Sequence, residues 1–536
     1  MRLSTKFYIM EDFVVGNLEL AQNVADGLEK SERWPEEREN FKRLYEGYQK
    51  FLSSETFKSG NQVFGNYTQS LIKKYLNDLK SLINSQLKCN KKALKNQIRC
   101  VIDKLRMIFE SLPSCYLLDV NDLECLPPDH PRHIALNSVT TIHTSDLKTY
   151  STQLSKFLVK YNALTVAFLE INKFKPSCFR DLLTGAMIVY YLTQHKKREK
   201  LLALYNIKLN IECISMLFRF TESNLARKLL PLSFPSIRTS ELIHIPRLSP
   251  VVNDNSIKTF LPFEPFSLSP DPSKVSVRII CRHKINLKSA NNNYNRLIIH
   301  VHGGGFVSQT SFSHQHYLRA WANEIDYPIF SVDYRLAPDH KFPAGIDDVW
   351  QAYTWLINNI ESALGIVPEK VVLIGDSAGG NFITGITLKA KEFGFRQPDS
   401  LLMIYPSMNM QAKYISSGAF YSLEDPLLTY GSFFEICKYY VNNPEDLDSY
   451  LVSPVLCPSH LLKNFPTTRL MLTWLDPLRS DNMRFMDRLL QHQADVQIQK
   501  YPEYVHGALN LATPNNVPML KHFIFDALNL LKPLIS

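Results

Sequence analysis

The spacing of apolar residues along the chain changes close to residue 240. Before that point apolar side chains recur every three or four residues, as in Leu71, Tyr75, Leu79 and Leu82, and glycines are few. This spacing is typical of helices that bury one face. Residues 1–240 are therefore predicted to form a mainly helical N-terminal domain.

A proline-rich stretch comes next. Proline fixes φ and has no amide donor, so a stretch rich in it is a poor candidate for regular helix. We therefore predict that residues 241–275 form a linker between two domains. Its prolines are Pro246, Pro250, Pro262, Pro265, Pro270 and Pro272.

Residues 276–536 show a different pattern, in which short runs rich in β-branched residues alternate with stretches of helical spacing. This alternation predicts an α/β domain whose mostly parallel sheet is covered by helices on both faces. The predicted strands are Val275–Cys281, Leu297–Val301, Ile329–Asp333, Val371–Ile374, Leu401–Tyr405, Arg469–Trp474 and Val496–Lys500.

The composition narrows the classes of function. A chain of 536 residues is too long for one core, which agrees with two domains. The net charge of +9 is spread along the sequence, so it does not indicate nucleic-acid binding, although it suits approach to an anionic lipid surface. The nine cysteines form no CxxC pair, and no apolar run reaches the length of a membrane span. We therefore expect a cytosolic protein with free thiols, no metal site and no signal peptide.

One short motif predicts a catalytic nucleophile. Gly375-Asp376-Ser377-Ala378-Gly379 has the form GxSxG and lies between the predicted strand Val371–Ile374 and the helical stretch Asn381–Leu388. In this strand–turn–helix setting the serine lies on a sharp turn that lifts its hydroxyl above the sheet. Ser377 is therefore the predicted nucleophile. The Ala378 amide, at a helix N-terminus, is a predicted donor to negative charge.

A glycine run predicts the rest of an oxyanion hole. His302-Gly303-Gly304-Gly305 follows the predicted strand Leu297–Val301. Glycines let backbone amides approach a ligand oxygen without interference from Cβ, and acyl transfer passes through a tetrahedral oxyanion that such amides stabilise. The predicted donors are the amides of Gly303, Gly304 and Ala378.

The acid and the base are expected to follow the nucleophile in the order serine, acid, histidine. Asp476 and His506 each lie just beyond a predicted strand, at the edge where ligands of open α/β sheets bind. We therefore predict that His506 takes the proton of Ser377 and that Asp476 orients the imidazole.

Rival residues for both roles are present. Asp481 is the alternative acid, five positions after Asp476. We expect His300 to pack within its strand and His302 to orient its own loop. The remaining rival bases, which have a less suitable setting than His506, are His314, His316, His340, His460 and His492.

Together these residues resemble the hormone-sensitive lipase family of α/β-hydrolases. The resemblance implies a serine ester hydrolase without a cofactor, which cleaves diacylglycerol, triacylglycerol, cholesteryl or retinyl esters through an acyl-enzyme on Ser377. It also implies action in the cytosol or at a lipid droplet or membrane surface, a capacity to form homodimers, and contact of the helical domain with a fatty-acid-binding protein. The segments that carry the resemblance are His302–Phe306, Asp333–Pro338, Gly375–Asn381, Asp476–Leu478 and His506–Gly507.

The sequence departs from this family pattern in several places, among them Ser480-Asp481, which replaces the paired acids that follow Asp-Pro-Leu in the family. Vertebrate members carry a regulatory insertion with phosphoserines between nucleophile and acid, and the interval from Ser377 to Asp476 leaves no room for it. The family's His-Gly-Phe is replaced by His506-Gly507-Ala508, a change beside the expected acyl pocket. Control by phosphorylation of that type is therefore not expected.

Two other functions stay open at this point. One is a carboxylesterase for smaller soluble esters, which would use the same mechanism. The other is a non-catalytic lipid-binding or receptor protein on the same fold. The joint presence of Ser377, Asp476 and His506 favours catalysis over the receptor.

Overall fold

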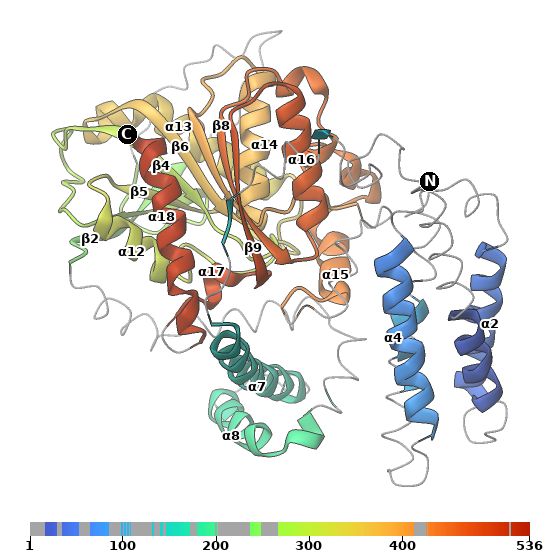
Figure 1. The fold of residues 1–536 in the computed structure, drawn as a ribbon. Helices are drawn as coiled ribbons and strands as arrows, with labels where there is room; N and C mark the ends of the chain where they lie inside the picture. Colours follow the sequence, from blue (N-terminus) through green and yellow to red (C-terminus); the bar gives the residue numbers. More distant parts are fainter. Residues whose placement is uncertain are drawn as a thin grey trace.

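A computed structural model gives the fold of the protein (Figure 1). It describes residues 17–28, 35–52, 65–84, parts of 98–108, 131–132, 140–142, 146–171, 179–198, 201, 236–247, 266–411, 425, 427–513 and 516–536. Within these ranges no helix combines the length and the apolarity needed to cross a membrane.

A nine-stranded sheet forms the centre of the fold (Figure 1). β3 runs antiparallel to both of its neighbours, β2 and β5, and all other neighbouring strands run parallel. The mostly parallel sheet is therefore confirmed, and every predicted strand is present with its ends moved by a few residues. Across the sheet the order is β1 (Thr140–Thr141), β9 (Val496–Val505), β8 (Thr467–Leu475), β7 (Ser400–Ile404), β6 (Ile366–Asp376), β4 (Tyr294–Val301), β5 (Ile329–Asp333), β3 (Lys274–Cys281) and β2 (Thr239–Pro246).

Helices cover both faces of the sheet, as predicted (Figure 1). Side chains alternate between the faces of a strand, so in β4 Ile299 packs in one core and Ile298 in the other. The core of Ile299 is completed by α13 (Ala344–Leu364), α14 (Ala378–Glu392), α15 (Tyr430–Tyr440) and α16 (Arg479–Gln491). The core of Ile298 is completed by α12 (Gln315–Glu324), α17 (Ala508–Leu511) and α18 (Lys521–Ile535).

The predicted linker is wrong at its beginning, because β2 extends to Pro246 and pairs along its whole length with β3. Its Ile243 and Ile245 are buried in the core. The prolines did not exclude a strand here because β2 is at the edge of the sheet, and Pro246 is its last residue, where a missing amide breaks no ladder. The sheet therefore begins before residue 276. Residues 248–265 of the predicted linker lie outside the described residues.

The first helices of the chain share a core of their own. Residues 17–28 are helical, and they are followed by α2 (Pro35–Leu52) and α4 (Gly65–Asn84). Val24, Phe41 and Leu76 from these three helices are buried together. This part agrees with the predicted helical domain.

The later helices of the predicted helical domain belong with the sheet instead. β1 pairs with β9, and Tyr150 of α7 (Leu147–Ile171) lies in the same core as α12 and α18. α8 (Phe179–Thr193) packs on α7. The domain boundary at residue 240 is therefore wrong for β1 and α7. Helical spacing shows that a face is buried but not which part of the chain buries it.

Candidate active site

Ser377 lies on a sharp turn between β6 and α14, where its backbone has a φ of 53°. A positive φ is strained for a residue with a side chain and persists only where surrounding contacts hold it. One such contact joins the Ser377 amide to the Ile404 carbonyl at 2.9 Å. A Cβ on Gly379 would come within 1.9 Å of the Val301 carbonyl, so glycine is required for α14 to start this close to β4. The turn has the geometry of a nucleophile elbow.

Ser377, His506 and Asp476 meet at the carboxyl ends of β6, β9 and β8. Ser377 Oγ lies 3.0 Å from His506 Nε2, and His506 Nδ1 lies 2.8 Å from Asp476 Oδ2. A carboxylate only accepts hydrogen bonds, so Nδ1 carries a proton and Nε2 is left to accept the hydroxyl proton of Ser377. Asp476 is held in turn by the Thr473 hydroxyl at 2.7 Å and the Leu478 amide at 2.8 Å. The structure thus brings together the three predicted catalytic side chains.

The charges around His506 favour its protonated form. Burial by itself lowers the pKa of His506, but the adjacent Asp476 carboxylate outweighs burial, and the net pKa lies above the ordinary value of 6.5. A general base works best when its pKa lies near the working pH, so this shift suits proton transfer from a serine. The imidazole is therefore poised to take the proton and to hold it while an intermediate forms.

The rival acid and one rival base have other partners. Asp481 pairs with Arg484 at 3.1 Å, so its carboxylate is not the partner of His506. His302 stacks on Tyr334 with ring centroids 4.2 Å apart, and its Nδ1 lies 2.7 Å from the Gly303 carbonyl. Both contacts brace the glycine loop, which agrees with the orienting role expected for His302.

His300 does more than pack within its strand. Its Nδ1 lies 2.8 Å from Ser331 Oγ, and its Nε2 lies 2.9 Å from the Tyr317 hydroxyl, so both ring nitrogens are hydrogen-bonded. Among the described histidines, His506 alone hydrogen-bonds to Ser377. Within the same ranges no group of three or more His, Cys, Asp or Glu side chains is arranged to hold a metal ion.

The glycine loop differs from the prediction in one donor. The Gly303 amide donates to Asp376 Oδ1 at 3.2 Å, so its only hydrogen is already committed to a buried carboxylate. The predicted role of Gly303 in an oxyanion hole is therefore wrong for this geometry. The amides of Gly304, Gly305 and Ala378 are the remaining candidates, and Ala378 is the first residue of α14, where helical amides have no partner within the helix.

Two further residues line His506, and the sequence analysis assigned neither of them a role in the site. Asp425 Oδ2 accepts the His506 amide at 3.3 Å, and burial raises the pKa of Asp425 to about 6. Tyr405 lies just beyond β7, and its ring meets that of His506 edge to face with centroids 5.0 Å apart. The position of Tyr405 at the carboxyl end of a central strand was the available signal, because this edge of the sheet carries the site.

Parts of the chain are similar to a known protein family and to several known proteins. Residues 298–510 match the family model described as alpha/beta hydrolase fold. Over 132 residues the chain is 45% identical to hormone-sensitive lipase of Mus musculus and 46% identical to that of Homo sapiens. This segment is 25% of the chain but only 17% of the mouse and 12% of the human protein, so most of each lipase lies outside the match.

Two other similar proteins match over a longer part of the chain. Carboxylesterase NlhH of Mycobacterium tuberculosis is 31% identical over 218 residues, which are 40% of the chain and 67% of that protein. Among solved structures, one described as a bacterial heroin esterase has a TM-score of 0.49 at 23% identity, and the match covers 61% of this chain and 94% of that one.

Proposed function

Since the chain belongs to the hormone-sensitive lipase family of α/β-hydrolases, whose named members here are lipases and esterases, we propose that it hydrolyses carboxylic esters with Ser377 as nucleophile. The observation that carries the proposal is the unbroken hydrogen-bonded series from Ser377 through His506 to Asp476. Such a series activates a hydroxyl that would otherwise be a weak nucleophile.

In the proposed reaction, His506 Nε2 takes the hydroxyl proton as Ser377 Oγ bonds to the ester carbonyl carbon. The carbonyl oxygen becomes an oxyanion, to which the amides of Gly304, Gly305 and Ala378 donate. When the intermediate collapses, the bond to the alcohol oxygen breaks and the alcohol leaves with the proton from His506. Water then attacks the acyl-enzyme with His506 again as base, which releases the carboxylic acid and restores Ser377.

We further propose that the esters are neutral lipids, namely diacylglycerol, triacylglycerol, cholesteryl or retinyl esters. The support is the 45% identity over 132 residues to a protein named as a lipase. Such substrates collect at lipid droplets or membranes. We propose that the protein works in the cytosol at these surfaces, which requires part of its own surface to bind lipid.

The exposed side of α8 supports such a surface. We call it the α8 face and define it by Leu183, Val189, Tyr190 and Leu192, which are exposed to 51%, 63%, 41% and 39%. The exposed Lys196 and Lys197 follow it, and Lys197 Nζ donates to the Tyr190 hydroxyl at 3.1 Å. An apolar helix face bordered by lysines is typical of helices that lie on anionic lipid.

α7 connects the α8 face to the catalytic part of the chain. Tyr150 of α7 packs against Tyr504 of β9 with ring centroids 5.3 Å apart, and Gln153 Oε1 accepts the Met519 amide at 3.0 Å. His506 follows β9 directly. A lipid surface held by the α8 face is therefore linked through two packed elements to the strand that leads into the catalytic base.

The test compares wild type with Ser377→Ala on two substrates, soluble p-nitrophenyl butyrate and emulsified dioleoylglycerol. We expect wild type to cleave both and the kcat of Ser377→Ala to fall at least about 10³-fold on each, because the substitution removes the hydroxyl that would form the acyl-enzyme. Equal turnover by the two proteins would exclude Ser377 as the nucleophile. No turnover of either substrate by wild type would favour a non-catalytic receptor.

A carboxylesterase for smaller soluble esters is the second candidate. It is favoured by the 31% identity to a protein named carboxylesterase, over a longer stretch than the lipase match. Strict preference for acetyl or butyryl esters, with no cleavage of dioleoylglycerol or cholesteryl oleate, would support this candidate over the lipase.

Two partners are proposed from the family resemblance alone. One is a second copy of the chain in a homodimer, which sedimentation of the purified protein would detect. The other is a fatty-acid-binding protein that would take up the released acid, which a binding titration with the isolated partner would detect. Neither partner is needed for the ester chemistry at Ser377.

A further inference from the structure

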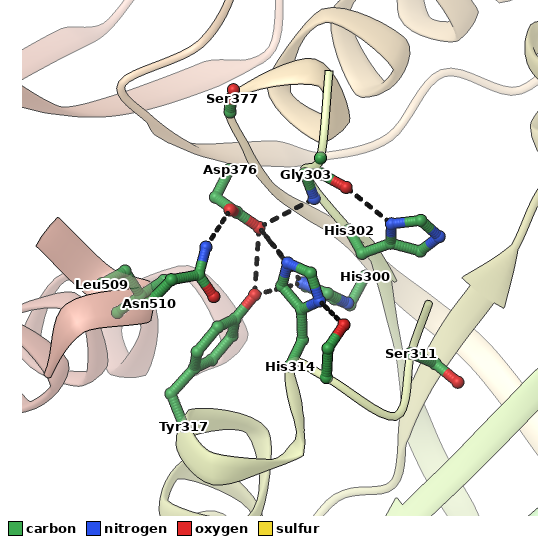
Figure 2. Close-up of polar contacts among 12 residues, drawn as sticks. His300, His302, Gly303, Ser311, His314, Tyr317, Asp376, Ser377, Leu509 and Asn510 are labelled. Carbon is green, nitrogen blue, oxygen red and sulfur yellow. Dashed lines mark hydrogen bonds and ion pairs between the residues drawn. The ribbon is translucent and has the colours of Figure 1, made fainter. Parts of the chain in front are cut away.

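A buried cluster of polar side chains lies directly beneath Ser377 (Figure 2). Its centre is Asp376, whose side chain is 1% exposed. From this cluster we infer that Asp376 is a positioning residue, which holds the glycine loop and the segment after His506 in register with the nucleophile. The inference rests on the proposed ester hydrolysis and adds a residue to its machinery.

The first contact fixes the glycine loop. Asp376 Oδ1 accepts the Gly303 amide, and a Cβ on Gly303 would lie 2.6 Å from Asp376 Oδ2. The loop backbone is therefore packed against the carboxylate with no room for a side chain. The bond fixes the peptide unit that leads into Gly303, and the tight packing against Asp376 limits how the backbone can turn at Gly303, the residue that leads to the amides of Gly304 and Gly305. Donors to an oxyanion must be aligned before the reaction, so their alignment depends on Asp376.

The second contact fixes the segment that carries the base. Asn510 of α17 donates from Nδ2 to Asp376 Oδ2 at 3.3 Å, and a dashed line joins the two side chains in Figure 2. α17 begins two residues after His506. Asp376 also directly precedes Ser377 in the sequence, so one residue connects the nucleophile, the oxyanion loop and the segment that follows the base.

The third contact supplies a one-way chain of donors. The Tyr317 hydroxyl donates to Asp376 Oδ1 at 3.0 Å, which uses its only proton. His300 Nε2 must then donate to the Tyr317 oxygen, and His300 Nδ1 accepts from the Ser331 hydroxyl. Every hydrogen bond in this series, from Ser331 through His300 and Tyr317, is donated in the direction of Asp376.

Two neighbouring histidines keep the Asp376 carboxylate ionised in spite of its burial. Burial by itself raises the pKa of Asp376, but the neighbouring His314 and His300 rings outweigh it and hold the pKa well below the ordinary value of 3.8. An ionised carboxylate with two accepting oxygens can serve Gly303, Tyr317 and Asn510 at once, whereas an amide cannot.

The test exchanges the chemistry of Asp376 and Asn510. In Asp376→Asn one of the former acceptors becomes an NH₂ group that faces a donor, so we expect kcat on p-nitrophenyl butyrate to fall about 10²-fold, as for a misplaced oxyanion donor. KM should stay within about threefold, and a trifluoromethyl ketone analogue of the transition state should bind more weakly by about the same factor as kcat. In Asp376→Asn with Asn510→Asp the amide again faces an acceptor, and we expect at least about tenfold recovery of kcat over the single variant.

Two milder variants keep the inference testable where Asp376→Asn does not fold. Asn510→Ala removes the contact between Asp376 and α17, the helix after His506. Tyr317→Phe removes another hydrogen bond to Asp376, but Tyr317 belongs neither to the glycine loop nor to the segment after His506. We expect Asn510→Ala to lower kcat more than Tyr317→Phe does. Thermal unfolding of each variant reports on the fold separately from kcat.

The inference is overturned if Asp376→Asn keeps kcat within threefold of wild type while its melting temperature drops, because Asp376 would then serve the fold alone. It is also overturned if the double variant recovers no activity, or if Tyr317→Phe and Asn510→Ala lose equal activity. These outcomes are distinct from failure of the proposed function, in which wild type itself would cleave no ester.

Discussion

The catalytic end of the sheet and the α8 face differ in which side chains they bury: the first buries charged groups, and the second exposes apolar ones. Around Ser377 the buried carboxylates are hydrogen-bonded. The side chains of Asp376 and Asp476 each have three hydrogen-bond partners. On the α8 face large apolar side chains are left in contact with solvent, with Val189 exposed to 63%.

The difference separates two tasks within the proposed lipase. Buried, paired charges act strongly on a reacting group because little solvent screens them. An exposed apolar surface does nothing for the chemical step but gains free energy when it enters lipid. Variants at the catalytic end should therefore affect every ester equally, whereas variants on the α8 face should affect only esters held in a lipid surface.

The largest effect is expected for Asp476→Asn. The amide can donate a hydrogen bond to His506 Nδ1, which favours the wrong tautomer, and kcat should fall about 10⁴-fold on both p-nitrophenyl butyrate and dioleoylglycerol. Asp481→Asn is the matched control, because Asp481 is a buried acid paired with Arg484. It should lose less than about tenfold. Comparable losses in the two variants, measured by steady-state kinetics, would contradict the assignment of Asp476.

The next effect is the loss of activity in acid. His506 must be neutral to take a proton, and its pKa is raised, so kcat/KM should fall about tenfold for each pH unit below that pKa. The Asp425 carboxylate contributes to raising the pKa of His506. Asp425→Asn should therefore shift the acid limb of the pH profile to lower pH. A limb that stays in place or moves to higher pH would show that Asp425 does not act on His506 through its charge.

The smallest effect is expected on the α8 face. Burial of one Leu or Val side chain stabilises by about 1.5–3 kcal/mol, so Leu183→Glu or Val189→Glu should weaken binding to anionic vesicles, and with it dioleoylglycerol hydrolysis, by about tenfold or more. Turnover of p-nitrophenyl butyrate should stay within about twofold. Val367→Glu is the matched control, since Val367 is a β6 residue exposed to 45% outside the α8 face. Equal losses on both substrates would contradict the separation of tasks.

The sequence predicted the catalytic end of the sheet well because its signals are local. Buried parallel strands appear as short β-branched runs, and the residues of an elbow lie next to one another in the chain. His506 and Asp476 followed from chain order and from their positions just after strands. The structure places both side chains in contact with their expected partners.

The features that were missed depend on contacts between distant residues. Asp376 occupies the variable position of GxSxG, so the motif gives no hint that its carboxylate accepts the Gly303 amide. β1 has only two residues, too few for any period, and it is recognisable only by its pairing with β9. The apolar face of α7 looked like part of a helical domain because its partners come from the end of the chain.

The pairing of β1 with β9 also sets an order of events during synthesis. Thr140 pairs with Gln499, so β1 finds its partner only after the long segment between them has been synthesised. Until then Tyr150 on α7 has no Tyr504 to pack against. Contacts between such distant segments slow folding and leave apolar surface open to aggregation in the meantime. The first helices share a core with residues up to 108, all close to them in the chain, whereas the region that joins α8 to the sheet has to wait for β9.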